Sequence, residues 1–214
     1  MEFKEFYWRK LPHIQPLGGM FFVTFNLKGA IPKWKLKQLK EEREVKYLQI
    51  LKRSQNKKRD LETLSRKMFI KYDKYLDSYS NSKMYLKNEE AAKTVADSLH
   101  FWDKKKIELL CYCIMANHVH VLMRLFDNSE TETPKALNQV MHSIKLYSAK
   151  KCNEFLGLEG NFWEEESYDR LIRNRKELRS IMRYILNNPV KAGLCKEMTD
   201  WKWSYIKEEY NDIF

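Results

Sequence analysis

The sequence predicts an α+β domain built on an antiparallel sheet that carries helices on one face. Three observations predict this fold: strand-like apolar runs alternate with helical stretches, two central strands are joined by a very short turn, and charged helical sequence interrupts one connection. The chain has 214 residues, and 43% of them are hydrophobic, which is enough for a packed core. No internal repeat or Pro/Gly/Ser-rich linker divides it, so we expect one domain over residues 1–214.

The first strand is expected from Met20 to Leu27, a run of apolar, β-branched and aromatic residues that follows the Gly18-Gly19 pair. From about residue 33 to residue 82 the chain changes character. It becomes rich in Lys, Glu, Leu and Arg, with almost no Gly or Pro, before a polar Ser/Asn stretch ends the pattern. We expect one or two long, solvated helices there, inserted into the first crossover between strands.

A helix is expected from Asn88 to Trp102, with Asn88 as its N-cap and an apolar stripe on one face. The almost continuous apolar run Ile107–Met115 predicts a central strand. The next strand is expected at Asn117–Arg124, which leaves room for only a tight turn between the two.

A second long helix is expected at Thr133–Leu156, ended by Gly157. Residues 162–174 predict a further strand, and Arg175–Asn187 a helix that Pro189 stops. The order strand, helix, strand, strand, helix, strand is the split βαβ or ferredoxin-like arrangement. The helix before Pro189, which contains a tyrosine, is then an extra C-terminal element.

The chain is strongly basic, with 40 Lys plus Arg against 29 Asp plus Glu and a formal net charge of +11. Such a balance favours an anionic partner, most often nucleic acid. The four cysteines do not form a disulfide framework in a chain of this length, which favours the reducing cytoplasm. The charged N-terminus has no signal-peptide core, and no apolar run of about 18 residues predicts a membrane span.

Two histidines, His118 and His120, alternate with Val119 and Val121 in "MANHVHVL". On a strand, residues i and i+2 lie on one face, about 7 Å apart, so two imidazoles can converge on one metal ion or phosphate oxygen. Two ordinary histidines on a half-exposed face are the simpler interpretation. The combination of a pair, a neighbouring apolar strand and a basic chain favours the ligand pair.

Cys111 and Cys113 share a face of the preceding strand and offer an alternative, a zinc site made with the histidine pair. Zinc sites more often use C-x-x-C spacing within a turn, and buried cysteines in a strand are commonly core residues. A zinc-dependent hydrolase is therefore the weaker alternative. A non-catalytic ferredoxin-like nucleic-acid-binding protein is another, although it would have no use for the histidine pair.

Tyr184 and Asn188 lie four residues apart in "RYILNNPV", so they share one helical face. A phenol hydroxyl and an amide oxygen would then point the same way. Considered without the histidines, this pair is explained equally well by core packing of the tyrosine and capping by the asparagine.

Four stretches, in order, resemble a known family: "GGMFFVTFNL", "CIMANHVHVLM", "NFWEEESYDRLIRN" and "MRYILNNPVKAGLCKEMTDWKWSY". Together they are similar to the REP-associated tyrosine transposases, a branch of the HUH single-tyrosine transposases (histidine, hydrophobic residue, histidine) related to small insertion-sequence transposases. The resemblance covers most of the chain except about residues 33–82. The histidine motif alone is weak, whereas its combination with the last stretch is distinctive.

The resemblance implies a metal-dependent single-stranded DNA endonuclease and strand transferase that cleaves through a 5′-phosphotyrosine intermediate at hairpin or palindromic DNA. It implies that His118, His120 and Asn188 hold Mg²⁺ or Mn²⁺, that Tyr184 is the nucleophile, and that the active form is a homodimer or a single chain. Asn188 stands where the family often has Gln. Tyr147 is a competing tyrosine on the earlier helix, without an amide at the matching spacing.

Two further departures from the family pattern concern turns and DNA contacts. Ala116 replaces the usual proline before the histidine motif, and Glu165 and Glu166 stand where a basic residue is common. DNA contacts are instead expected from aromatic and basic residues near the two ends of the chain, which suit base stacking and phosphate binding. They are Trp8, Arg9, Lys10, Lys191, Trp201, Lys202 and Trp203. Core packing is the alternative for Trp201 and Trp203.

Overall fold

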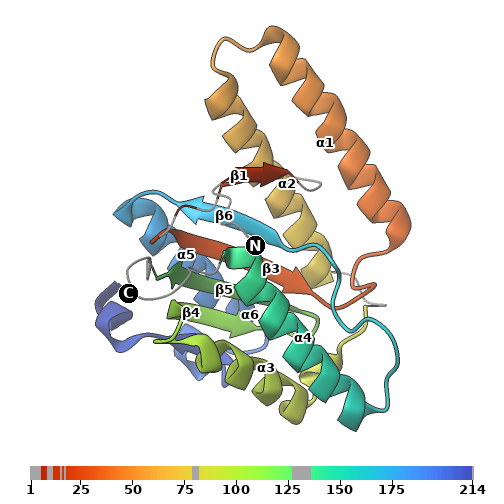
Figure 1. Cartoon of the computed structure of the whole chain (residues 1–214), viewed down its shortest axis with the longest axis vertical. Helices are drawn as coiled ribbons and strands as arrows, with labels where there is room; N and C mark the ends of the chain where they lie inside the picture. Colours follow the sequence, from red (N-terminus) through yellow and green to blue (C-terminus); the bar gives the residue numbers. More distant parts are fainter. Residues whose placement is uncertain are drawn as a thin grey trace. The chain divides into compact units, whose positions relative to one another are not determined.

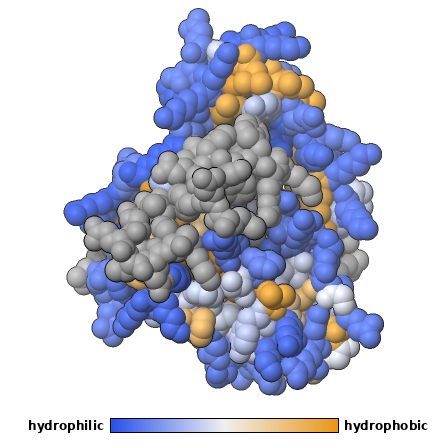
Figure 2. Space-filling view, viewed as in Figure 1, coloured by the Kyte–Doolittle hydropathy of each residue, from blue (hydrophilic) through white to orange (hydrophobic). Residues whose placement is uncertain are grey.

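A computed structural model describes residues 6–8, 12–14, 16, 18–78, 82–126 and 136–213. The chain forms two compact units, which we call the sheet unit (Met1–Leu27 with Met84–Phe214) and the helical unit (Lys28–Lys83). No helix in the described ranges is long and apolar enough to cross a membrane. Hydrophilic side chains cover most of the surface visible in Figure 2, as the charged composition leads one to expect.

The sheet unit is built on five antiparallel strands in the order β6-β3-β5-β4-β7 (Figure 1). They are β3 (Met20–Asn26), β4 (Ile107–Ile114), β5 (His118–Leu125), β6 (Tyr168–Ile172) and β7 (Ser204–Ile206). Read across the sheet from β6, the first four strands are the fourth, first, third and second of the five in chain order, which is the strand order of a ferredoxin-like sheet. The predicted α+β fold with an antiparallel sheet is therefore confirmed.

Two features of the strands were not predicted. The three-residue strand β7 pairs with β4, and a separate two-stranded sheet joins β1 (Phe6–Trp8) to β2 (Pro12–Ile14). The strand predicted over residues 162–174 is shorter than expected, because only Tyr168–Ile172 pairs with β3. Trp163, before it, makes a single bridge to Leu27.

Strand β3 has two different faces because side chains alternate along it. Phe21, Val23 and Phe25 are completely buried on one face. The other face carries Thr24, directly opposite His120 in the register, and Asn26, opposite His118. The strand therefore contributes to the core on one side and to the surroundings of the histidines on the other.

Helices α3 (Glu89–Trp102) and α4 (Leu137–Leu156) pack side by side on the face that carries Phe21 and Phe25 (Figure 1). The predicted cap of α3 is confirmed, because the Asn88 Oδ1 accepts a 3.0 Å hydrogen bond from the Ala91 amide. Helix α4 ends as predicted at Gly157, whose φ of +63° suits glycine. Residues 127–135, where the start of α4 was predicted, lie outside the described residues.

Helix α5 (Arg175–Leu186) lies on the opposite face of the sheet, where it contacts β4 and β5. Its first turn is fixed by Asn174, whose side-chain oxygen accepts a hydrogen bond from the Glu177 amide. Glu177 also pairs with Arg170 of β6. Helix α5 ends at Leu186, one residue before the predicted end, and the chain then forms the short helix α6 (Asn188–Lys191), because proline is tolerated in a first helical turn.

A β-bulge in β4 decides which way its cysteines face. The register shifts between Leu109 and Cys111, so that Cys111 pairs with Leu122 and Cys113 with His120. An extra residue in one strand reverses the alternation beyond it. Both cysteines therefore lie on the histidine face of the sheet.

The helical unit consists of α1 (Lys33–Arg53) and α2 (Lys57–Ser78), so the charged stretch does form long helices as predicted. The two helices share a small apolar core that contains Leu39, Leu64 and Met68. The carboxylate of Glu42 accepts hydrogen bonds from Lys46 on α1 and Lys71 on α2. These two ammonium groups lower the pKa of Glu42 to about 2.

Three 3₁₀ helices complete the described part of the chain: η1 (Tyr85–Lys87), η2 (Met198–Asp200) and η3 (Glu208–Ile213). The first leads into α3, and the other two flank β7. A hydrogen bond from the Leu86 amide to the Ala116 carbonyl joins the first to the β4–β5 turn. The turn that has Ala116 in place of proline is therefore also attached, through this hydrogen bond, to the 3₁₀ helix that precedes α3.

Candidate functional site

His118 and His120 are buried, with exposed fractions of 1% and 0%. Both come from the start of β5 and lie on the same face, as the i, i+2 spacing predicts. Their imidazole rings are tilted by 73°, with centroids 4.7 Å apart. Their Nε2 atoms are only 3.1 Å apart, so both rings direct the same nitrogen toward one point.

The second nitrogen of each ring already has a protein partner. His118 Nδ1 lies 2.6 Å from Asn117 Oδ1, and His120 Nδ1 lies 2.8 Å from Thr24 Oγ1. An amide oxygen only accepts, so His118 carries its proton on Nδ1 and presents the Nε2 lone pair. Metal-ligating histidines characteristically bind a protein oxygen through the other ring nitrogen, which fixes the tautomer and the ring orientation.

The spacing of the Nε2 atoms suits a divalent ion. Two ligands held at right angles, each about 2.1 Å from an octahedral ion, are themselves about 3.0 Å apart. The observed 3.1 Å agrees with that separation. Two buried imidazoles with oriented Nδ1 atoms and convergent Nε2 atoms therefore fit as a pair of metal ligands.

Tyr184 lies in the last turn of α5, beside the histidines. Its ring centroid is 5.6 Å from that of His120, and the two rings meet at 65°. Phe22 of β3 packs edge-on against Tyr184 at 5.9 Å and contacts His120 at 5.7 Å. Because Phe22 is completely buried, it forms an apolar support that fixes both rings.

Asn188 is 2% exposed and begins α6. Its side-chain Nδ2 donates a 2.7 Å hydrogen bond to the Tyr184 carbonyl oxygen, so the two residues of the predicted pair are linked. That bond uses the amide nitrogen, whereas a metal would require the amide oxygen. The linkage therefore places Asn188 beside the tyrosine, and its service as a third ligand stays a prediction.

Lys191, at the end of α6, places its Nζ 4.7 Å from the centre of the Tyr184 ring. The side chain is exposed. On a helix, side chains lean toward the N-terminus, so a lysine two turns later can reach back to the tyrosine. This residue, one of the predicted DNA contacts, adds a positive charge next to the candidate nucleophile.

Tyr147, the competing tyrosine, lies on α4 and is 53% exposed. Helix α4 covers the opposite face of the sheet from the histidines. Its Ser148 accepts a hydrogen bond from Trp163 Nε1, and Trp163 packs against Phe25 on that face. The structure therefore brings Tyr184, not Tyr147, to the histidine pair.

The zinc alternative is only partly matched by the structure. Cys113 lies opposite His120, yet within the described residues no cysteine sulfur joins the two imidazoles in a cluster of three ligand atoms. Cys113 Sγ contacts Met115 Sδ at 3.5 Å. Burial raises the pKa of the Cys111 thiol, which keeps it protonated. These are the properties of core cysteines.

The predicted DNA contacts near the C-terminus lie together after η2. Trp201 Nε1 donates a 3.0 Å hydrogen bond to the Ile114 carbonyl, which attaches this segment to the end of β4. Lys202 Nζ pairs with Glu89 at 2.8 Å and lies 5.0 Å from the Trp203 ring. Trp201 thus has a structural role. Arg9, Lys10 and the side chain of Trp8 lie outside the described residues.

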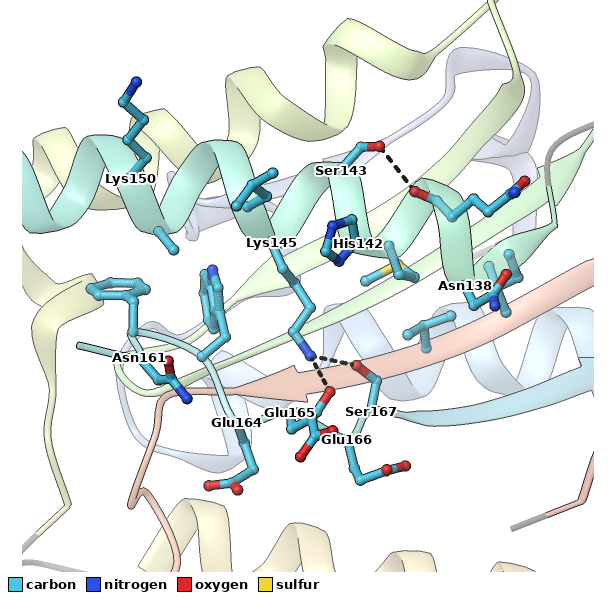
Figure 3. A pocket seen from close by; sticks show the side chains of 18 of the residues that line it. Asn138, His142, Ser143, Lys145, Lys150, Asn161, Glu164, Glu165, Glu166 and Ser167 are labelled. Carbon is cyan, nitrogen blue, oxygen red and sulfur yellow. Dashed lines mark hydrogen bonds between the residues drawn. The ribbon is translucent and has the colours of Figure 1, made fainter. Parts of the chain in front are cut away.

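A groove of about 920 Å³ lies between α4 and the segment that leads into β6 (Figure 3). Lys145 crosses it and donates to the Glu165 carbonyl at 3.0 Å and to Ser167 Oγ at 3.1 Å. Glu165 and Glu166, two departures from the family pattern, line this groove. Its wall includes Val23, on the β3 face that points away from the histidines. The groove is therefore separate from the site that the histidines form.

Several residues of the site were not identified from the sequence. Asn117 could have been found, because it directly precedes the histidine motif. Thr24 and Phe22 could not, because only the pairing of β3 with β5 places them beside His120. Sequence spacing identifies ligands within one strand, whereas their supporting partners come from the neighbouring strand.

We expect replacement of Thr24 by Val to weaken divalent-metal binding by about 10- to 100-fold, because His120 loses the hydroxyl that orients its ring. Mn²⁺ binding followed by electron paramagnetic resonance would measure the change. Thr24→Ser keeps the hydroxyl and is the matched control. Equal Mn²⁺ affinity in wild type and Thr24→Val would show that the hydrogen bond at 2.8 Å has no part in metal binding.

Comparison with known proteins adds independent information. The family described as "Transposase IS200 like" matches residues 65–188, which is more than half of the chain and includes both histidines and Tyr184. A Haemophilus influenzae protein assigned as a REP-associated tyrosine transposase is 28% identical over 102 residues, which cover 45% of this chain and 57% of that protein. The REP-associated tyrosine transposase of Escherichia coli K12 is 27% identical over 100 residues, covering 47% and 54%.

The chain thus spans a little more than half the length of the curated relatives it matches. Among solved structures, a REP-associated tyrosine transposase bound to a REP hairpin aligns with a TM-score of 0.52 and 19% identity. The alignment covers 92% of this chain and 80% of that one. At this identity the likeness establishes a shared fold.

Proposed function

Because the chain belongs to the family of IS200-like transposases, we propose that it cleaves and rejoins single-stranded DNA in a metal-dependent reaction. Tyr184 would be the nucleophile, with His118, His120 and Asn188 as metal ligands. The observation that carries the proposal is the placement of the Tyr184 ring against His120, whose Nε2 converges with that of His118. A tyrosine can serve as a covalent nucleophile, and two convergent imidazoles beside it can hold a metal ion that activates the reaction.

The chemistry follows from the tyrosine. Its Oη attacks the phosphorus of one phosphodiester while the bond from phosphorus to the 3′ oxygen breaks. The phenol loses its proton, the departing 3′ oxygen gains one, and the 5′ phosphate remains on Tyr184 as a phosphotyrosine. This link conserves the energy of the broken bond, so a 3′-hydroxyl from another strand can reverse the reaction without ATP.

The two imidazoles and the Asn188 amide oxygen would hold Mg²⁺ or Mn²⁺. When bound, such an ion neutralises charge on the phosphate and favours attack. The protein's own part is to orient the ligands: Asn117 and Thr24 fix the two rings, and Phe22 supports the tyrosine. A site fixed in this way needs little rearrangement when the phosphate arrives.

Lys191 supports the same proposal from the side of the substrate. An ammonium 4.7 Å from the Tyr184 ring suits a contact with the phosphate that is attacked or with its neighbour. The exposed position of Lys191 allows that contact without burial of an unpaired charge. We therefore assign Lys191 to phosphate binding beside the nucleophile.

The substrate we propose is single-stranded DNA with a hairpin or palindrome, the kind of ligand named for the solved transposase of similar fold. The net charge of +11 supports a nucleic-acid substrate. We further propose that the chain acts in the cytoplasm as one catalytic domain in which the helical unit is an insertion. We also propose that the chain forms a homodimer. Covalent capture that returns when chains lacking Tyr184 are mixed with chains lacking His120 would demonstrate it.

The test is covalent capture of labelled single-stranded and hairpin DNA by the purified protein. We expect a denaturation-resistant adduct that requires Mg²⁺ or Mn²⁺ and disappears with a chelator. DNA binding should weaken steeply with salt, since each phosphate contact on a single strand contributes about 0.7 to the logarithmic slope. Binding without any adduct, in every metal tested, would instead favour a non-catalytic nucleic-acid-binding protein.

A further inference from the structure

The segment where α3 turns into β4 carries an exposed aromatic ring and three consecutive lysines. Phe101, at the end of α3, is 57% exposed although its side chain is large and apolar. Lys105 places its Nζ 3.5 Å from the centre of the Phe101 ring. Lys104 and Lys105 are both exposed, whereas Lys106 is half-buried. We call Phe101, Lys104 and Lys105 the lysine-turn surface.

The backbone of this turn is unusual. Lys104 has a φ of +61° and is the one residue other than glycine in the described ranges with a positive φ. Left-handed backbone is sterically unfavourable for a residue with a Cβ, so glycine or asparagine is the ordinary choice. The turn therefore keeps a lysine at a position where glycine is the ordinary choice.

Hydrogen bonds hold the turn rigidly. The Lys104 amide donates to the Ile107 carbonyl at 2.9 Å, and two further amides of the turn donate to the Trp102 carbonyl. The Asp103 carboxylate accepts from the Leu109 amide at 2.8 Å. The Asp103 carboxylate is thus hydrogen-bonded to the backbone. The lysine-turn surface is presented in a fixed geometry.

We propose that the lysine-turn surface binds unpaired DNA nucleotides, with one base stacked on the Phe101 face that Lys105 does not cover and adjacent phosphates contacted by Lys104 and Lys105. An exposed aromatic ring interleaved with ammonium groups is the usual means of holding single-stranded nucleic acid without sequence preference. The choice of DNA as the ligand follows from the proposed function, on which this inference rests. An acidic protein would also be attracted by the lysines, but the exposed aromatic ring beside them favours stacking with a nucleic-acid base.

The surface is distinct from the histidine site. Strand β4 runs from the turn at Ile107 to Ile114, which pairs with Val119 between the two histidines. Its seven steps of about 3.3 Å separate the two places by about 23 Å. The lysine-turn surface would therefore hold DNA remote from the scissile phosphate, contributing to affinity and not to the chemical step.

The test is binding of a labelled DNA hairpin with an oligothymidine tail, measured at several salt concentrations. Phe101→Ala should weaken binding roughly 10-fold through lost stacking. The double variant Lys104→Gly, Lys105→Gln should lower the logarithmic salt slope by about 1.4, the value for two phosphate contacts. Lys104→Gly should fold at least as stably as wild type, because glycine suits the backbone, so its loss of binding cannot be ascribed to unfolding.

Lys93→Gln is the matched control, because Lys93 is an exposed lysine on α3 that is paired with Asp97. We expect it to keep the wild-type affinity and salt slope. Covalent capture by the wild-type chain is measured on the same DNA. Capture by wild type with unchanged binding in Phe101→Ala and the double variant overturns this inference alone. A wild-type chain that neither binds nor captures DNA overturns the proposed function as well.

Discussion

Tyr184→Phe is expected to eliminate covalent capture of DNA while DNA binding stays within about twofold of wild type. The change removes one oxygen atom, the nucleophile, and leaves the ring that packs against Phe22 and His120. Loss of a covalent nucleophile removes the reaction itself, so this is the largest effect that any substitution should have. Electrophoresis of the adduct under denaturing conditions, with binding measured in parallel, would show both parts of the result.

Tyr147→Phe is the matched control for that substitution. It removes the same atom from a tyrosine that is 53% exposed on α4. Capture should proceed at the wild-type rate in this variant. If Tyr147→Phe abolished the adduct and Tyr184→Phe retained it, the nucleophile would have to be reassigned to the other face of the sheet.

His120→Ala is expected to lose both metal binding and DNA cleavage, with a fall in the capture rate of at least about 1,000-fold. Removal of a ligand lowers metal affinity, and loss of charge stabilisation at the phosphate removes several kcal/mol from transition-state stabilisation. His118→Ala should behave alike, because the two Nε2 atoms converge at 3.1 Å. Mn²⁺ affinity and single-turnover capture would be measured on the same samples.

His142→Ala serves as the control for a lost imidazole. His142 lies on α4 and lines the groove of Figure 3, away from the convergent pair. Its replacement should leave Mn²⁺ binding and capture unchanged. Cleavage that persists in His118→Ala or His120→Ala, with its metal requirement intact, would mean that the ion is held by other residues.

Much of the fold could be predicted because its signals are local. The alternation of histidine and valine in β5, the Asn88 cap and the glycine at the end of α4 each act within a few residues. The same is true of His118, His120 and Tyr184, whose spacing and sequence context made them candidates. Their roles as ligands and nucleophile stay predictions that the variants above would test.

What could not be predicted depends on pairing between distant segments. The hydrogen bond between Thr24 and His120 joins residues 96 positions apart and exists only because of the β3–β5 register. The bulge in β4 turns Cys111 and Cys113 to the histidine face, although their spacing alone would allow either face. Strand β7 has three residues, too few for a pattern to be recognised.

The attachment of α5 has a mechanical consequence for Tyr184, the proposed nucleophile. The helix is fixed at its start, where Asn174 caps it and Arg170 of the edge strand pairs with Glu177, whereas Tyr184 stands near its far end. Nine helical steps from Arg175 amount to about 14 Å, so a tilt of about 10° at the start would displace Tyr184 by about 2 Å. At the far end, Phe22 packs against the Tyr184 ring and Asn188 donates to the Tyr184 carbonyl, so the helix is held at both ends. Since a misplacement of about 1 Å can cost about 100-fold in rate, both attachments are needed to keep the phenol of the proposed nucleophile in position.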